Sequence, residues 1–275
     1  MLLWSTGFIG ARLGMPHAEP MTFLALRFLI TAACLAVVAV LWRVAWPTRL
    51  VDWGHLAVAG LLMHGVYLGG VFVAIRLGLE AGLSALIVSL QPLLVAAAAP
   101  FILAETIGWR RWLGLGLGML GAALVLSGKL GHGAAFLAVF ACVVALLGIT
   151  IGTLYQKRHC VGHDLRSANT IQFAAAGTAC WVLALLFETR HIDWTGELVF
   201  ALAWLVIVLS LGAIPLLYML LRRGDASRVA SLFFLVPPTT AMLAWPLFGE
   251  HLGPVEMLGM AIALGGVVLV NREAG

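Results

Sequence analysis

Runs of apolar residues separated by short polar links dominate the pattern of this chain. A helix needs roughly 20 such residues to cross about 30 Å of hydrocarbon. Ten candidate runs cover residues 1–14, 21–42, 53–76, 81–103, 109–128, 134–156, 167–187, 195–221, 226–248 and 254–271. The pattern therefore predicts an all-α integral membrane protein with ten transmembrane helices and no link long enough for a soluble domain.

Composition supports this interpretation. Hydrophobic residues make up 63% of the 275 positions and charged residues only 10%, whereas soluble domains carry about 25% charged residues. This composition excludes most cytosolic enzymes, DNA-binding modules and secreted disulfide scaffolds. The formal charge of +4 indicates cytoplasmic loops rather than a nucleic-acid partner. The four cysteines form no Cys-x-x-Cys pair and are interpreted as packing residues.

The distribution of basic residues predicts the orientation of the chain, because cytoplasmic loops carry an excess of Lys and Arg. With the N-terminus inside, the cytoplasmic links hold Arg43, Arg49, Arg110, Arg111, Lys157, Arg158, Arg166, Arg222, Arg223, Arg228 and Arg272. The external links hold only Arg12, Arg76, Lys129 and Arg190. We therefore expect both termini in the cytoplasm.

The first run is shorter than a membrane span. Its 14 residues reach only about 21 Å at 1.5 Å per residue. It lacks a charged leading region and a small-residue cleavage site, which argues against a signal peptide. We expect a first helix that is truncated at its N-terminal end.

An internal repeat becomes visible when the chain is shifted along itself by 145 positions. Residues 80–128 then align with residues 225–273 without a gap, and the identical pairs include Pro92 with Pro237 and Glu105 with Glu250. The same shift aligns Phe28 with Phe173. Each half, 1–128 and 134–275, holds five spans, so the second half must enter the membrane inverted. Inverted repeats are typical of secondary transporters.

These features resemble the drug/metabolite transporter superfamily, EamA branch, over essentially the whole chain. The resemblance rests on Arg27 early in the second span, the Pro-bearing fourth and ninth spans, and the junctions at Glu105 and Glu250. The opening "WSTGFIGARLG" followed by "EPMTFLALRF" is most similar to YddG-type amino-acid exporters.

The resemblance implies a secondary transporter of the bacterial inner membrane that exports amino acids, aromatic or otherwise apolar, by alternating access. It implies no enzymatic activity and no cofactor. The expected partners are a small-molecule substrate and the lipid bilayer, with no nucleic acid. The duplication already supplies both halves, so we expect a functional monomer.

Export of other small metabolites or drugs stays open as an alternative. A second alternative, an intramembrane serine protease, would use Ser84 with His64 as base.

Candidate substrate-binding residues are polar or aromatic side chains near the middle of the predicted spans. A polar group at that depth should face the protein interior, and aromatic rings can stack on bulky apolar cargo. The candidates are Trp4, His64, Tyr67, Gln91, Trp204, Phe233 and Phe234. Core packing or an ordinary interhelical hydrogen bond is the structural alternative for each of them. Arg27 could snorkel to the interface or make an internal structural contact.

Two further sets of residues have structural roles in the prediction. Pro92, Pro237 and Pro238 should break the fourth and ninth spans, because a proline donates no backbone hydrogen bond. Small residues line one face of the fifth and tenth spans and should let these helices pack closely. They are Gly114, Gly118 and Gly121, and Gly259, Ala263 and Gly266.

Several kinds of chemistry have little support in the sequence. Every Asp and Glu falls at a span end, so we expect no proton coupling through a mid-membrane carboxylate. The segment from His159 to Asp164 has no second ligand cluster, and we expect no metal site there. Gly116 to Gly121 match a dinucleotide-binding motif but have no strand before them.

Overall fold

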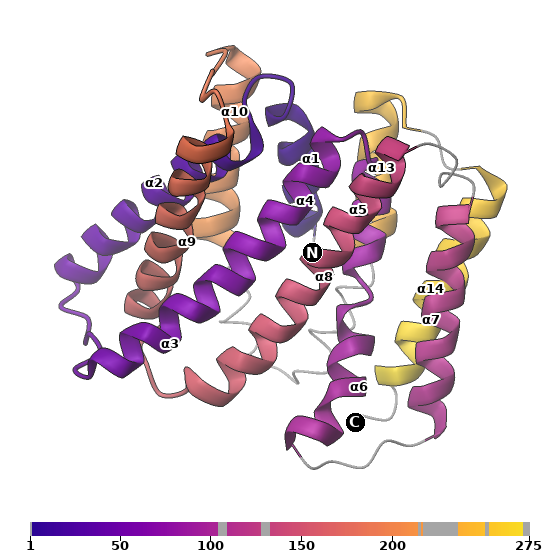
Figure 1. The fold of residues 1–275 in the computed structure, drawn as a ribbon, viewed down its shortest axis with the longest axis horizontal. Coiled ribbons are helices and arrows are strands. Elements are labelled where there is room, and N and C mark those ends of the chain that lie inside the picture. Colours follow the sequence, from indigo (N-terminus) through magenta and orange to yellow (C-terminus); the bar gives the residue numbers. More distant parts are fainter. Residues whose placement is uncertain are drawn as a thin grey trace.

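The protein is a bundle of helices in the computed structural model (Figure 1). The structure describes residues 2–103, 109–127, 133–213, 216, 236–250 and 253–271. Within these ranges the regular structure is helical, apart from one isolated bridge between Ala18 and Ile192. Helices suit this sequence because lipid offers no hydrogen bonds, so each backbone group must find its partner within the chain.

The helices follow the apolar runs closely. In chain order they are α1 (Leu2–Gly14), α2 (Pro20–Leu41), α3 (Leu50–Gly60), η1 (Leu61–Val66), α4 (Tyr67–Arg76), α5 (Ala81–Val88), α6 (Gln91–Leu103), α7 (Trp109–Ser127), α8 (Gly133–His159), α9 (Leu165–Phe187), α10 (Gly196–Ala203), η2 (Trp204–Ala213), α13 (Val236–Phe248) and α14 (Pro254–Asn271). The segments η1 and η2 are π-helical. They lie inside longer helical spans, so α3, η1 and α4 form one span.

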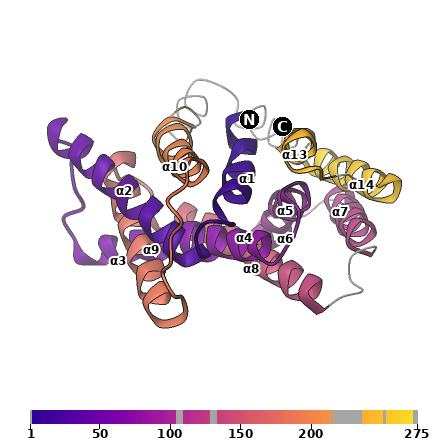
Figure 2. The same cartoon turned by 90° about the horizontal axis from the view of Figure 1, so that it is seen from above.

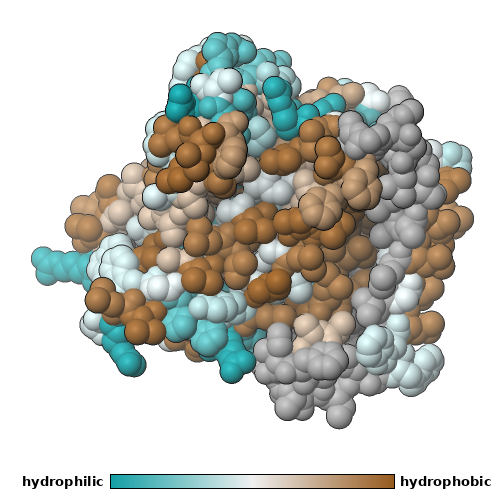
Figure 3. Space-filling model, in the orientation of Figure 1, coloured by the Kyte–Doolittle hydropathy of each residue, from teal (hydrophilic) through white to brown (hydrophobic). Residues whose placement is uncertain are grey.

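The protein is a multi-pass membrane protein. Of the described residues, five helices are long and apolar enough to cross a membrane: Pro20–Leu41, Leu50–Arg76, Phe136–His159, Leu165–Phe187 and Gly196–Ala213. Large apolar side chains lie on the outside, among them Phe136 at 60% and Leu186 at 68% exposure. Figure 3 shows this brown surface between more polar ends. An apolar surface of this extent needs lipid as its solvent.

Helical segments of the two sequence halves align under the 145-residue shift. Helix α9 begins 145 positions after α2, and the shift superposes the described parts of α6 on α13 and of α7 on α14. The same shift carries η1 into the range of η2. Two related halves would give this spacing. The spacing of the helices is evidence separate from the identical residues that the same shift aligns.

Helices from the two sequence halves pack against each other in pairs. Helix α2 packs on α9 and α7 packs on α14. Seen from above (Figure 2), α7 and α14 form one end of the molecule and α2, α3 and α9 the other, with α1, α4, α5 and α8 between them. The core is therefore continuous across both halves and includes residues from α1, α2, α4, α5, α8 and α9.

The α7–α14 contact is made by the small residues expected to form it. A Cβ on Gly121 would overlap backbone atoms of Gly259 and Ala263. A Cβ on Gly266 would lie 2.5 Å from the carbonyl oxygen of Gly114 and 2.7 Å from the backbone nitrogen of Gly118. The two backbones are thus close enough that only glycine fits at these positions. Dispersion contacts between them replace the hydrophobic effect, which does not drive helix association in lipid.

We predict that Gly266→Ala lowers the thermal midpoint of the detergent-solubilised protein, because the new methyl group meets backbone that cannot move cheaply. Overpacking of this kind costs about 1–3 kcal/mol. Gly265→Ala is the matched control, since a Cβ on Gly265 meets nothing within 4 Å. That variant should be neutral or more stable by roughly 0.5–1 kcal/mol, because alanine favours a helix over glycine. Equal midpoints for the two variants would contradict the packing account.

Candidate functional site

The candidate site lies where regular helical geometry is interrupted within two spans. Segments η1 and η2 carry wider π turns. Such turns are rare in proteins, and those that occur often lie at functional sites. In η2 the Ser210 hydroxyl donates to the carbonyl of Leu205, five residues earlier, at 3.0 Å. The carbonyl oxygen of Leu205 therefore has a hydrogen-bond partner within the π-helical segment, where the regular backbone hydrogen-bond pattern is interrupted. His64 belongs to η1, and Trp204 is the first residue of η2.

Aromatic rings meet between these two segments. Phe28 on α2 and Phe173 on α9, which the 145-residue shift aligns, have ring centroids 5.7 Å apart. Both side chains are almost fully buried. The His64 ring stacks on Phe173 at 4.1 Å with an interplanar angle of 16° and lies 5.9 Å from Phe28. The predicted residue His64 is therefore part of an interior aromatic cluster, and its buried Nε2 makes no hydrogen bond within the described part of the chain.

Arg27 points into the same region. Its side chain is 4% exposed, and its Nη2 donates to the Ser210 hydroxyl of η2 at 3.4 Å. The guanidinium carbon lies 5.7 Å from the centroid of the Phe28 ring. Of the two readings that the sequence allowed, the internal contact is the one observed, and Arg27 does not snorkel.

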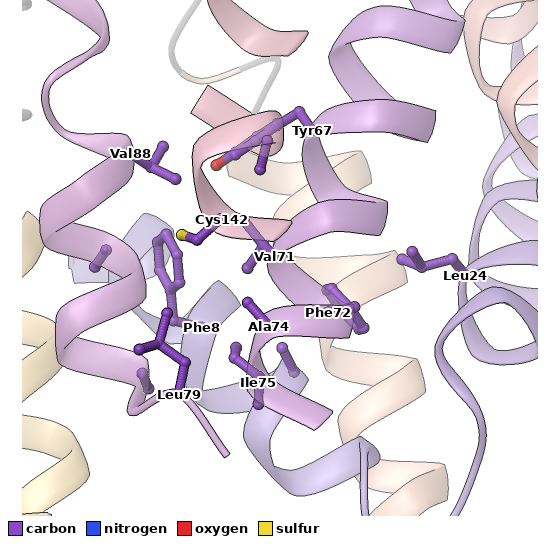
Figure 4. Packing of buried hydrophobic residues seen from close by; sticks show 14 of the residues in the cluster. Phe8, Leu24, Tyr67, Val71, Phe72, Ala74, Ile75, Leu79, Val88 and Cys142 are labelled. Carbon is purple, nitrogen blue, oxygen red and sulfur yellow. The ribbon is translucent and has the colours of Figure 1, made fainter. Parts of the chain in front are cut away.

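Tyr67 lies one turn beyond His64, as the first residue of α4, and is 7% exposed. Figure 4 shows its hydroxyl end directed toward Val88 of α5, near Cys142 of α8. The Cys142 thiol donates to the carbonyl of Ser84 at 3.7 Å, which ties α8 to α5. Tyr67 therefore faces the protein interior, between α4, α5 and α8, rather than lipid.

The fourth predicted span is interrupted beside Gln91. Helix α5 ends at Val88 and α6 begins at Gln91, with Pro92 as its second residue. Proline suits the first turn of a helix, where its missing N–H has no intrahelical partner to lose. The Gln91 amide donates to the Thr153 hydroxyl of α8 at 2.9 Å. Pro237 and Pro238 lie in α13, and the residues that precede it, where the predicted break of the ninth span would fall, lie outside the described residues.

The predicted tryptophans are associated with α1. The Trp204 indole donates to the Thr6 hydroxyl of α1 at 2.8 Å. Trp4 also lies on α1 and is half-buried against the main core. Phe233 and Phe234 lie outside the described residues. The structure thus distributes the candidates over an aromatic centre at His64, a hydrogen bond to α8 at Gln91, and α1 at Trp4 and Trp204.

Four residues of the aromatic centre were not chosen from the sequence as substrate contacts: Arg27, Phe28, Phe173 and Ser210. The available signal was the 145-residue shift, which aligns Phe28 with Phe173 and Arg27 with Gln172. Gln172 is 2% exposed. The aligned pair Phe28 and Phe173 is in contact in the structure, so this shift was the sequence signal for the cluster.

Neither the metal nor the protease reading gains support. The described residues contain no group of three or more metal-ligating side chains. The Ser84 hydroxyl is buried and makes no hydrogen bond to His64. A serine nucleophile requires a base within hydrogen-bonding reach.

Comparison with known proteins identifies the family. The model of the EamA-like transporter family matches residues 1–127 and 136–272. The chain belongs to the EamA-like transporter family. These two ranges fall on either side of the link between α7 and α8.

Relatives of this EamA-family chain are distant but cover nearly all of it. An uncharacterized transporter of Bacillus subtilis, YvbV, is 24% identical and covers 100% of this chain and 90% of its own. A protein of Salmonella typhimurium named "Probable amino-acid metabolite efflux pump" is 22% identical over 98% of this chain and 91% of its own. A solved crystal structure with 20% identity matches 99% of this chain and 94% of its own with a TM-score of 0.70, which supports the fold alone.

A second group of contacts joins the halves at the upper end of Figure 1. Glu188, after α9, accepts hydrogen bonds from the backbone amides of Met21 and Thr22, both at 2.7 Å. Glu250, after α13, accepts from the amide of Ala81 at 3.0 Å and lies 3.6 Å from Arg12. Each carboxylate therefore binds the N-terminus of a helix from the first half, where the helix dipole favours negative charge.

Burial raises the pKa of Glu250 above its ordinary value, and the Ala81 hydrogen bond and the Arg12 charge oppose that shift only in part. The folded protein thus binds this proton more tightly than the unfolded chain. The cost of the charged carboxylate is present at neutral pH and disappears as the pH falls through the raised pKa.

We predict that Glu250→Gln raises the thermal midpoint at neutral pH, and that this gain shrinks as the pH falls toward 4.5, the ordinary glutamate value. Thermal unfolding in detergent across that range measures it. Glu197→Gln is the control, because the Glu197 side chain is 68% exposed and pairs with His17 at the surface. A gain that grows with falling pH would contradict the sign of the shift.

Proposed function

We propose that this EamA-family protein exports amino acids, aromatic or otherwise apolar, across a bacterial inner membrane by alternating access. One observation carries the proposal: π-helical segments interrupt two spans that the 145-residue shift aligns, with buried aromatic rings and a guanidinium between them. In secondary transporters, interrupted helices near mid-membrane border the substrate site. The interruptions are tolerable there because they line protein or a cavity rather than lipid.

The lining residues support an apolar amino acid as cargo. We assign substrate contacts to His64, Tyr67 and Gln91, with Trp4 and Trp204 on the α1 side. Rings provide apolar surface, and the amide and phenol provide a few directed hydrogen bonds, a combination typical of small-molecule sites. The names of the Salmonella relative and of a "Probable terminal-alkyne amino-acid exporter" from Streptantibioticus cattleyicolor agree with this class.

The two inverted halves, 1–128 and 134–275, would exchange access between the two ends of the bundle. With both termini cytoplasmic, the upper end in Figure 1 faces outward, and the contacts of Glu188 and Glu250 hold that end closed. Opening it for release requires these contacts to separate. A single chain supplies both halves, so we propose that the monomer is the functional unit.

The test is counterflow in proteoliposomes with radiolabelled aromatic, aliphatic and charged amino acids. We expect saturable uptake of apolar amino acids and about a tenfold or larger loss of kcat/KM in the double variant Tyr67→Ala plus Gln91→Ala. Each lost contact is worth about 1 kcal/mol, and about 1.4 kcal/mol corresponds to tenfold.

Tyr155→Ala is the control for this experiment. Tyr155 also lies on a spanning helix, α8, and makes a side-chain hydrogen bond, to His55 at 2.7 Å, but it is assigned no substrate contact. That variant should keep its transport rate. No movement of any amino acid would refute the proposed cargo and direct the search to other small metabolites or drugs.

A further inference from the structure

The guanidinium of Arg27 is a buried charge, and no ion pair joins it to a carboxylate of the described residues. It lies seven residues after the start of α2 at Pro20, about 10 Å along the helix axis, and is 4% exposed. A cation at this depth in a membrane protein is costly unless it is paired. A buried guanidinium is therefore expected to pair with an anionic group, either of the protein itself or of a bound ligand.

The described part of the chain does not neutralise it. Nη2 donates to the neutral Ser210 hydroxyl at 3.4 Å, and the buried Nε has no hydrogen-bond partner in that part. The ion pairs found among the described residues belong to Arg12, His17, Arg166 and His191. The Phe28 ring at 5.7 Å offers a cation–π contact, which satisfies none of the N–H donors.

The charge is present in only one of the two halves. The 145-residue shift aligns Arg27 with Gln172, which is equally buried but neutral. The neighbouring positions carry the same residue in both halves, Phe28 and Phe173, and these rings touch. The aromatic centre thus has apolar surface shared by both halves and a single positive group on one side. That arrangement is complementary to a ligand with an apolar body and one anionic end.

We propose that the Arg27 guanidinium binds the carboxylate of the cargo; this inference rests on the proposed function and names the recognition chemistry of the same site. Guanidinium presents its N–H groups in a planar fork that matches a carboxylate with two parallel hydrogen bonds. The unpartnered Nε and the weakly engaged Nη2 lie on one edge of that fork. One positive charge among apolar rings matches one negative charge.

The test compares ligands that differ only at the anionic group. L-phenylalanine, L-phenylalaninamide and 3-phenylpropionate are used as competitors of transport and as stabilisers in thermal-shift measurements of the detergent-solubilised protein. We expect the two carboxylates to bind, and the amide to bind about 10- to 100-fold more weakly, because a charged hydrogen-bonded pair is lost. An amide that binds as tightly as the carboxylates would overturn the proposal.

The variants separate recognition from structural support. Arg27→Gln gives the first half the side chain that the second half already has at Gln172, so the carboxylate-to-amide preference should fall to about one. Arg27→Lys should keep part of the preference. Arg190→Gln removes a basic side chain from the exposed link after α9 and should leave the preference unchanged. A purely structural Arg27 would weaken carboxylate and amide equally, and an unchanged preference in a folded Arg27→Gln protein would overturn the proposal.

Failure of the proposed function gives a different result. If no amino acid is transported, the exporter proposal fails, and the thermal-shift comparison still decides the role of Arg27. Stabilisation by 3-phenylpropionate that is lost in Arg27→Gln would support the anion site. Stabilisation by neither carboxylate would overturn it.

Discussion

The absence of water in the hydrocarbon core is the constraint on which the rest of this structure depends. Every backbone N–H and C=O at that depth needs a partner from the chain, which accounts for helices throughout the described spans. Any departure from the regular ladder must then be compensated locally. At η2 the compensation is visible, because the Ser210 hydroxyl bonds to the Leu205 carbonyl. Interruptions are therefore informative in this molecule: they persist only where neighbouring side chains support them.

The same constraint divides the molecule into packing regions and a polar centre. Helices α7 and α14 approach through glycine, which brings their backbones together at one end of the bundle (Figure 2). Polar side chains are instead collected around η1 and η2, where Arg27 and His64 adjoin the rings of Phe28 and Phe173.

Much of the fold could be predicted from the sequence, because hydrophobic length and small-residue faces are local properties. The run 109–128 contains α7 (Trp109–Ser127), and the run 254–271 contains α14 (Pro254–Asn271). The glycines expected to bring these helices together are those found at their contact. The inverted orientation of the halves and the count of ten membrane crossings stay predictions.

The candidate site was less accessible to sequence reasoning. His64, Tyr67 and Gln91 do face the interior, but the π turns at η1 and η2 leave no local signal, because they depend on packing between helices distant in the chain. Arg27 was ambiguous for a related reason: a long side chain near a helix end can turn toward either interface or core. The direction of the Arg27 side chain depends on how α2 packs against η2, which is a property of the tertiary structure and not of the local sequence.

The central claim is that the ends of the bundle open alternately around this centre. Pulsed electron paramagnetic resonance tests it directly, with spin labels at Trp194, in the link between α9 and α10, and at Val255, the second residue of α14, which are exposed at 64% and 56%. The free cysteines Cys34, Cys142, Cys160 and Cys180 are first replaced. The account predicts two distance populations in liposomes whose ratio shifts when a transported amino acid is added. A single distribution that no transported amino acid changes would contradict it.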